Sequence, residues 1–182
     1  MHRRVFLSLA AAGLIATRAH AQEHPPSAVE IVRPILPPQD ISSLIMTDIE
    51  GAPVALGDYL GRIIVLNLWA SWCPPCRREM PSLSRLADLV DPAQITVLPL
   101  AFDKANPARA QRFFKHAGIT NLPILLGDGQ NLQEVFGQGL LPTTLILDKS
   151  GQHIYTAKGE AQWDDAPTLK WLNYLASRAE PI

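Results

Sequence analysis

Residues 63–76 read Ile-Ile-Val-Leu-Asn-Leu-Trp-Ala-Ser-Trp-Cys-Pro-Pro-Cys, an apolar run followed by two cysteines three positions apart. An apolar run without alternation, as in 63–69, is typical of a strand buried on both faces of a central sheet. Beyond the cysteines, apolar residues recur at helical spacing as far as Val90, which predicts an amphipathic helix over 74–90. The stretch thus predicts a buried strand that leads through a cysteine pair into a helix.

The sequence on the C-terminal side continues this alternation. An apolar run predicts a strand at 95–102, and Asn106, Pro107 and Gly118 are placed as the N-cap, first residue and stop of a further helix. The remaining patterns are a short apolar segment at 122–126, a brief helix at 132–136, a hairpin with strands at 145–148 and 153–157, and a closing helix around 169–176. Together they predict an α/β chain with a mixed central sheet and helices on both faces, as in the thioredoxin-like fold.

The length of 182 residues suits one ordinary domain. We assign this domain to residues 41–182, because the preceding segment 22–40 is rich in proline. Such a density predicts an extended, poorly packed linker. The prolines in question are Pro25, Pro26, Pro34, Pro37 and Pro38.

The first 21 residues have the pattern of an export signal. Arg3 and Arg4 precede an apolar run over 5–16, and Ala19-His20-Ala21 supplies small residues for cleavage. The two arginines fit either a twin-arginine signal or an ordinary secretory signal. The run is shorter than the roughly 20 residues of a membrane-spanning helix, yet an uncleaved N-terminal anchor remains the alternative to cleavage. Either way, we expect a location outside the bacterial cytoplasm, in the periplasm.

Charge gives no sign of a general attraction to nucleic acid or to an anionic membrane, since 16 Lys plus Arg stand against 17 Asp plus Glu. Removal of residues 1–21 would take away three arginines and leave 13 basic against 17 acidic residues. We expect a mildly acidic monomer that does not bind nucleic acid, and whose function depends on a local site.

The two cysteines form no framework of structural disulfides, which predicts a chemical role for the pair. If the helix begins at Pro74, Cys73 is its N-cap, and the first amide able to reach its sulfur is that of Cys76, because neither proline has an N–H. The positive end of the helix dipole also lowers the pKa of a thiol there. Cys73 is the predicted nucleophile and Cys76 the resolving thiol of a redox-active disulfide.

Two other interpretations of the pair are weaker. A zinc site would need two further thiol or imidazole ligands, and beyond the signal the chain offers only His24, His116 and His153, without paired spacing. An inert disulfide would close a tiny loop and so constrain the unfolded chain very little. We therefore expect neither a bound metal nor another cofactor.

The segment 69–81, Trp-Ala-Ser-Trp-Cys-Pro-Pro-Cys-Arg-Arg-Glu-Met-Pro, resembles the active-site segment of the TlpA/ResA-like family of exported thiol-disulfide oxidoreductases. The resemblance covers roughly 44–177. It implies an enzyme that reduces protein disulfides, with apocytochrome c or copper-site proteins as partners and a membrane thiol reductase as electron donor. The direction of electron flow stays open, because about 30 mV corresponds to only about 1.4 kcal/mol for a two-electron couple.

The resemblance extends through residues 141–144, Leu-Pro-Thr-Thr, which match the family's cis-proline loop. It implies a cis bond before Pro142, next to the cysteines, with the backbone of Leu140 and Leu141 free to bind an extended partner segment. An ordinary trans proline is the alternative. Trp72, beside the reactive thiol, is expected either in the docking surface or in simple packing.

The chain departs from the wider thioredoxin pattern at Asn67, where thioredoxins carry a buried Asp. An amide cannot accept the proton of Cys76. Glu79 lies three residues further along the same side of the helix, and the family resemblance places an acid there. Glu79 is therefore either the proton acceptor or a carboxylate that merely favours the first helical turn.

Two different functions compete with protein-disulfide reduction. A thiol peroxidase of the peroxiredoxin type normally carries a Thr three residues before the reactive Cys, and here that position is Ala70. A metallochaperone could hold Cu(I) through Cys73 and Cys76, since two thiolates suit this ion.

Overall fold

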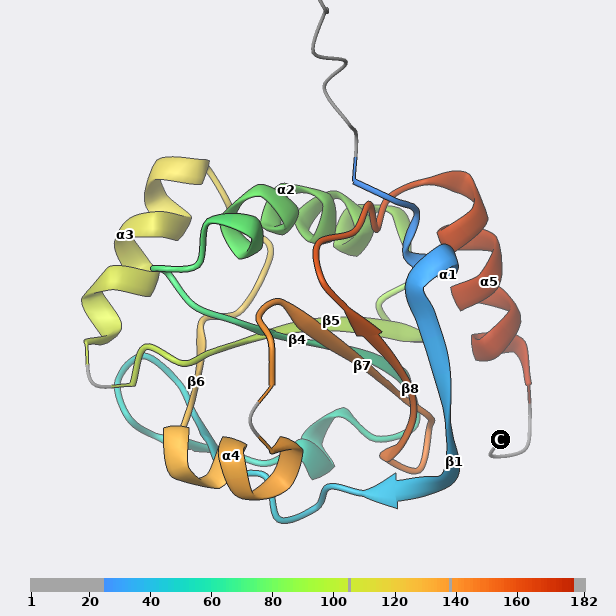
Figure 1. Ribbon diagram of the computed structural model, residues 1–182, viewed down its shortest axis with the longest axis horizontal. Coiled ribbons are helices and arrows are strands. Elements are labelled where there is room, and N and C mark those ends of the chain that lie inside the picture. The colour runs from blue at the N-terminus through green and yellow to red at the C-terminus, as the bar shows by residue number, and fades with distance from the viewer. Residues whose placement is uncertain (1–24, 105, 138, 179–182) are drawn as a thin grey trace, which may run out of the picture.

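A computed structural model describes residues 25–178 apart from 105 and 138. Helices pack on both faces of a central mixed sheet (Figure 1), which confirms the predicted fold class. The strands are β1 (Val32–Asp40), β2 (Met46–Thr47), β3 (Pro53–Val54), β4 (Ile63–Trp69), β5 (Ile95–Ala101), β6 (Leu125–Gly127), β7 (Thr143–Leu147) and β8 (Gln152–Lys158). The helices are α1 (Ala28–Ile31), the 3-10 turn η1 (Leu56–Tyr59), α2 (Pro74–Leu89), α3 (Pro107–Ala117), α4 (Gly129–Phe136) and α5 (Ala166–Ser177).

Strand β4 lies at the centre of the sheet, whose order is β1-β8-β7-β4-β5-β6-β2-β3. It runs parallel to β5 and antiparallel to β7, so Asn67 has Pro99 on one side and Thr144 on the other. All seven of its residues are buried. The uninterrupted apolar run is explained by this position, because both faces of the strand are covered by other elements.

The two faces of β4 supply two separate cores. Ile63 and Val65 point towards α2, α3 and α5, whose buried apolar residues include Met80, Phe114 and Leu172. Residues Ile64, Leu66 and Leu68 point the other way, towards η1, α4 and the segment before β2, which supply Leu56, Leu132 and Ile41. This alternation follows from the period of two along a strand. The two cores hold the C-terminal end of β4, and hence the start of the cysteine segment, between two packed layers.

Within the predicted linker 22–40, the described residues 25–40 differ from the poorly packed segment expected from the prolines. Residues 32–40 form the edge strand β1, which pairs antiparallel with β8 from Val32 opposite Ala157 to Asp40 opposite Gln152. An edge strand tolerates proline because only one of its sides must be hydrogen-bonded, and the register shifts between Pro34 and Gln39. Ala28, before β1, is fully buried. Packed structure therefore begins well before residue 41.

The predicted signal at 1–21 lies outside the described residues. Within the described part of the chain, every helix is too short or too polar to cross a bilayer.

Candidate active site

The cysteine pair lies where β4 passes into α2. Cys73 is the N-cap of α2, and its Sγ accepts a hydrogen bond from the Cys76 amide at 3.3 Å. Pro74 and Pro75 occupy the first two helical positions, which confirms the predicted N-cap and its single available amide. Cys73 and Cys76 are joined by a disulfide with an S–S distance of 2.06 Å, so this is the oxidised form. The same amide is placed to donate to a Cys73 thiolate after reduction.

An acidic side chain from the next strand fixes the turn before the cysteines. Asp103, just after β5, accepts hydrogen bonds from the Ser71 amide at 2.7 Å and from the Ser71 hydroxyl at 2.8 Å. Asp103 is only 5% exposed. Sequence reasoning missed this contact. The sequence does contain a signal for this contact. Asp103 follows a buried strand that runs parallel to β4, so it lies at the same edge of the sheet as the cysteines.

Glu79 is buried in α2, one turn after Cys76, with 1% of its surface exposed. Its Oε1 accepts a hydrogen bond from Trp163 Nε1, while Oε2 has no hydrogen-bond partner among the described residues. Burial raises the pKa of Glu79 to about 8, the bond from Trp163 opposes this shift, and the Glu160 carboxylate adds to it. Glu79 is therefore not a solvated carboxylate that merely favours the first helical turn.

Asn67 is buried behind the pair and forms a neutral contact. Its Nδ2 donates to Thr144 Oγ1 at 2.9 Å, across the β4–β7 pairing, and neither group can accept a proton near neutral pH. Of the buried carboxyl groups in the described residues, Asp103 is bonded to Ser71 and Asp148 to the β7–β8 turn. Glu79 is the buried carboxyl group on α2, the helix that begins at the cysteine pair.

The loop before β7 has the predicted cis bond between Leu141 and Pro142. The pairing of β7 starts at Thr143, so residues 140–142 precede the ladder. The freedom expected of the Leu140 backbone is only partial, however, because its carbonyl already has one hydrogen-bond partner. It accepts a hydrogen bond from the Thr143 hydroxyl at 2.6 Å.

Cys73 and the loop before β7 face each other across a cleft of about 530 Å³. Trp72, Cys73, Pro74 and Pro75 line one side, and Phe102, Gln133, Gly137, Gly139, Leu140 and Leu141 complete the lining. Cys76 is absent from the lining and Trp72 is 61% exposed. The structure thus brings Trp72, Cys73 and Leu141 together at the cleft, while Cys76 and Glu79 lie buried in α2.

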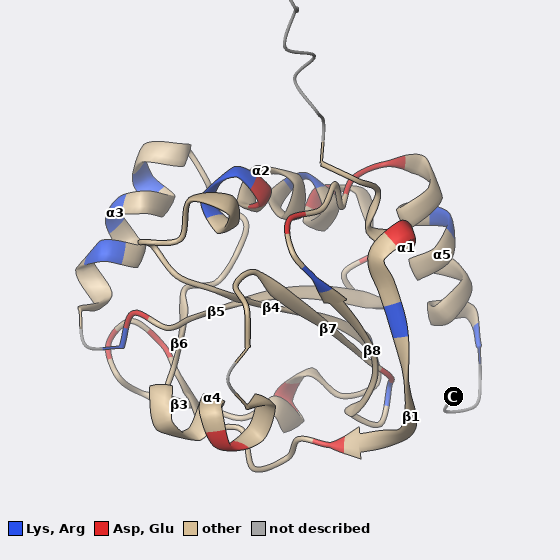
Figure 2. Cartoon of the chain, in the orientation of Figure 1, with Lys and Arg blue, Asp and Glu red and all other residues tan. Residues whose placement is uncertain are grey.

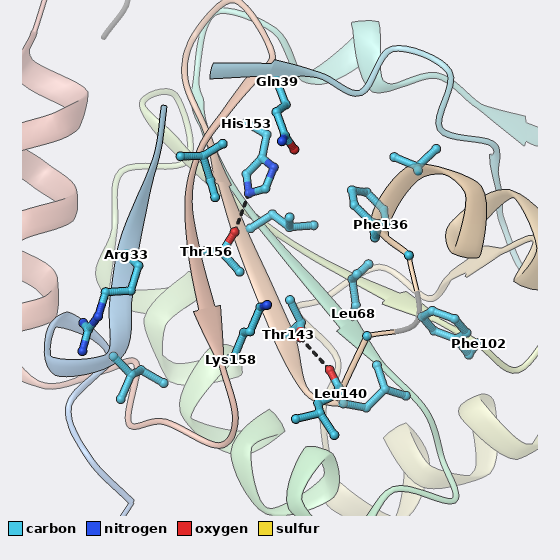
Figure 3. A pocket seen from close by; sticks show the side chains of 17 residues that line it. Arg33, Gln39, Leu68, Phe102, Phe136, Leu140, Thr143, His153, Thr156 and Lys158 are labelled. Atoms are coloured by element: carbon cyan, nitrogen blue, oxygen red, sulfur yellow. Dashed lines mark hydrogen bonds between the residues drawn. The ribbon is translucent and has the colours of Figure 1, made fainter. Parts of the chain in front are cut away.

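Gly137, Gly139, Leu140 and Leu141 also border a second cavity, of about 570 Å³, between α4 and the β1–β8–β7 part of the sheet (Figure 3). Inside it, His153 Nε2 lies 2.7 Å from Thr156 Oγ1, and burial lowers the pKa of His153. Phe102, Gly137, Gly139, Leu140 and Leu141 are common to this cavity and the cleft. These five residues therefore border both the cleft and the second cavity, which the sequence did not indicate.

Of the three candidate histidines, His24 lies outside the described residues, and the other two lie on elements that do not carry the cysteines. His116 lies on α3 and His153 on β8, and no group of three or more His, Cys, Asp or Glu side chains within 25–178, gaps excepted, is placed to hold a metal ion.

Comparison with known proteins agrees with this site. The profile of the AhpC/TSA family matches residues 38–155. The thiol-disulfide oxidoreductase ResA of Bacillus thuringiensis (strain Al Hakam) is 30% identical over 122 residues, which cover 67% of this chain and 69% of ResA.

Solved structures extend the agreement to the fold. A DsbF homologue from Corynebacterium diphtheriae superposes with a TM-score of 0.62 at 26% identity, over 77% of this chain and 91% of that one. A secreted Mycobacterium tuberculosis disulfide oxidoreductase homologous to E. coli DsbE gives a TM-score of 0.59 at 26% identity, over 72% and 95%. With its cysteine pair at the start of α2, the chain belongs to the AhpC/TSA family and is a thioredoxin-like thiol-disulfide oxidoreductase of the ResA type.

Proposed function

We propose that this enzyme reduces disulfides of partner proteins outside the cytoplasm, with Cys73 as nucleophile, Cys76 as resolving thiol and Glu79 as proton acceptor. The observation that carries the proposal is the difference in position between the two cysteines. Cys73, 4% exposed, lines the cleft at a helix N-cap, whereas Cys76, 1% exposed, does not line it and is followed by a buried acid.

The reaction starts from the reduced protein. The Cys73 thiolate attacks one sulfur of the partner's disulfide, which forms a mixed disulfide and releases the partner's other sulfur as a thiolate. The Cys76 thiol then gives its proton to the ionised form of Glu79, which is the minority form at neutral pH because the pKa is about 8. The Cys76 sulfur attacks Cys73 Sγ. The Cys73–Cys76 disulfide forms, the second partner sulfur leaves and is protonated, and the partner has gained two electrons.

The pKa of Glu79 suits the transfer of this proton. A value of about 8 brings Glu79 much closer to the roughly 8.5 of an ordinary cysteine thiol than a solvated carboxylate is, so accepting a thiol proton costs Glu79 less free energy. An exposed carboxylate, with an ordinary pKa near 4, would be a much weaker base. The burial that raises the pKa of Glu79 therefore supports its role.

The partner segment is proposed to lie in the cleft between Trp72 and Leu141, with Pro142 holding the loop beside the disulfide. The Leu140 carbonyl already accepts one hydrogen bond, from Thr143, so we expect Leu141 to supply the main backbone contact. This places the partner's sulfur near Cys73 while Cys76 stays covered.

Partners and location follow from the relatives. Resemblance to TlpA and ResA proteins supports apocytochrome c or copper-site proteins as substrates and a membrane thiol reductase as electron donor. A solved relative described as secreted supports a periplasmic location. We propose that residues 1–21 direct export and that the exported monomer folds from about Ala28 onwards, since Ala28 is fully buried.

Trapping tests the proposal directly. In cells that make the Cys76→Ala variant, mixed disulfides cannot be resolved, so partner proteins should accumulate on Cys73 and be released by dithiothreitol. The double variant Cys73→Ala/Cys76→Ala should trap none. If the single variant captures no more protein than the double variant, protein-disulfide reduction by Cys73 is wrong.

A further inference from the structure

A shallow hollow of about 450 Å³ opens on the α3 side of Trp72. Its lining is Ser71, Trp72, Arg77, Arg109, Arg112, Phe113 and His116, and we call this surface the basic hollow. Trp72 also lines the cleft that contains Cys73, so the two surfaces meet at this side chain. Whatever docks at the disulfide therefore lies next to the basic hollow.

The charge of the basic hollow has a single sign. Arg77 comes from the first turns of α2, and Arg109, Arg112 and His116 recur at intervals of three and four residues on α3, which places them on one helix face. Figure 2 shows basic positions along α3 and at the start of α2, and the sequence of α3 contains no acid. The arginines stand out because the chain as a whole is close to neutral.

The three arginines of the basic hollow form no ion pair within the described residues. The ion pairs within the described residues engage Arg78 with Glu160, Arg85 with Asp164 and Lys104 with Asp128. Arg77, Arg109 and Arg112 take part in none of them, and all three are exposed. Asp103, the acid beside this surface, is bonded to Ser71. Three guanidinium groups thus remain available for carboxylates from outside.

We propose that the partner protein carries an acidic segment next to its reactive cysteine, and that this segment binds the basic hollow while the cysteine reaches Cys73. The inference rests on the proposed function and adds the chemistry of the partner. Guanidinium groups bind carboxylates in a bidentate manner, and Trp72 gives the adjoining backbone an apolar surface. Opposite charges also speed encounter, and this gain is lost as salt increases.

The experiment uses the reduced full-length protein and two disulfide-containing peptides. The peptides share their sequence except that Asp and Glu flank the cysteines in one, and Lys and Arg in the other. At low salt, the second-order rate of thiol exchange should be about tenfold higher for the acidic peptide. The ratio should fall towards one at about 1 M salt, where the Debye length is near 3 Å.

Charge-reversal variants show which residues produce the preference for the acidic peptide. Arg109→Glu and Arg112→Glu should each lower the acidic-to-basic rate ratio several-fold, whereas Lys170→Glu, which makes the same change at an exposed position of α5, should leave it unaltered. The salt dependence of the native protein tests the proposal without any variant. Equal rates for both peptides overturn this inference and leave the proposed function standing. A ratio that responds equally to Lys170→Glu also overturns it, and failure to reduce either peptide overturns the proposed function itself.

Discussion

Trp163 donates its indole N–H to Glu79 inside the core, which links the segment before α5 to the helix that carries the cysteines. The two residues are 84 positions apart in sequence. The contact leaves the second carboxyl oxygen of Glu79 without a hydrogen-bond partner among the described residues. One oxygen thus holds the side chain in place while the other can take a proton.

Replacing Glu79 with Gln should slow the step in which Cys76 resolves the mixed disulfide. The amide can keep the contact with Trp163 but cannot accept a proton, and loss of a general base typically costs about 10²-fold or more in rate. Stopped-flow measurement of thiol release from a preformed mixed disulfide reads this step. Glu134→Gln, at an exposed position of α4, is the control and should retain the native rate. A native rate in Glu79→Gln would remove Glu79 from the mechanism.

Stability of the oxidised protein should fall as pH rises from about 4.5 to about 8. The pKa of Glu79 is raised to about 8 by burial, so in this window the unfolded chain has lost the proton that the folded chain keeps. The unfolded state then binds fewer protons, and the free energy of unfolding decreases with pH, by a few kcal/mol in total. Urea denaturation at several pH values measures the slope. In Glu79→Gln the decrease over this window should be much smaller, and an unchanged slope would contradict the assignment.

The Asp103→Ala variant should lose both stability and activity. It leaves the Ser71 amide without its carboxylate and frees the turn that positions Cys73, at a cost of about 1–3 kcal/mol. Thermal unfolding gives the stability, and peptide-disulfide reduction gives the rate. Ser71→Ala removes only the hydroxyl contact and should have a smaller effect on both. Equal effects of the two variants would show that the amide contact does not matter.

The two tryptophans that flank the turn should behave in opposite ways. Trp69 is 1% exposed and packs against Phe113 and Phe114, so Trp69→Ala should cost about 3–5 kcal/mol. Trp72 is 61% exposed, and Trp72→Ala should change stability by no more than about 0.5 kcal/mol. It should nevertheless raise the KM for a disulfide peptide several-fold. A Trp72 variant with a native KM would argue against docking at this side chain.

The local parts of this fold could be read from the sequence. β4, α2 and the N-cap at Cys73 depend on neighbouring residues, so the apolar run, the helical spacing and the two prolines were sufficient to predict them. The cis bond before Pro142 came from family resemblance. Glu79 could be named as a candidate, but its burial depends on Trp163 and was not visible in the pattern.

The parts that escaped prediction depend on distant residues. Asp103 and Ser71 are 32 positions apart, and the signal for their contact is indirect, since it requires knowing that β5 runs parallel to β4. The proline content predicts a linker where β1 lies, because composition cannot distinguish a free proline-rich segment from an edge strand that pairs on one side. Its partner β8 lies more than 100 residues further along the chain.

The prolines of β1 also affect self-association of the protein through the edges of its sheet. β1 and β3 are the two edges of the sheet, where unpaired N–H and C=O groups could template aggregation. Pro34, Pro37 and Pro38 have no N–H to offer, and the register shift interrupts the row further. At the opposite edge, β3 is two residues long and begins with Pro53. Both edges thus carry features that disfavour extension of the sheet by another chain, and strand-to-strand association between molecules is correspondingly less favourable.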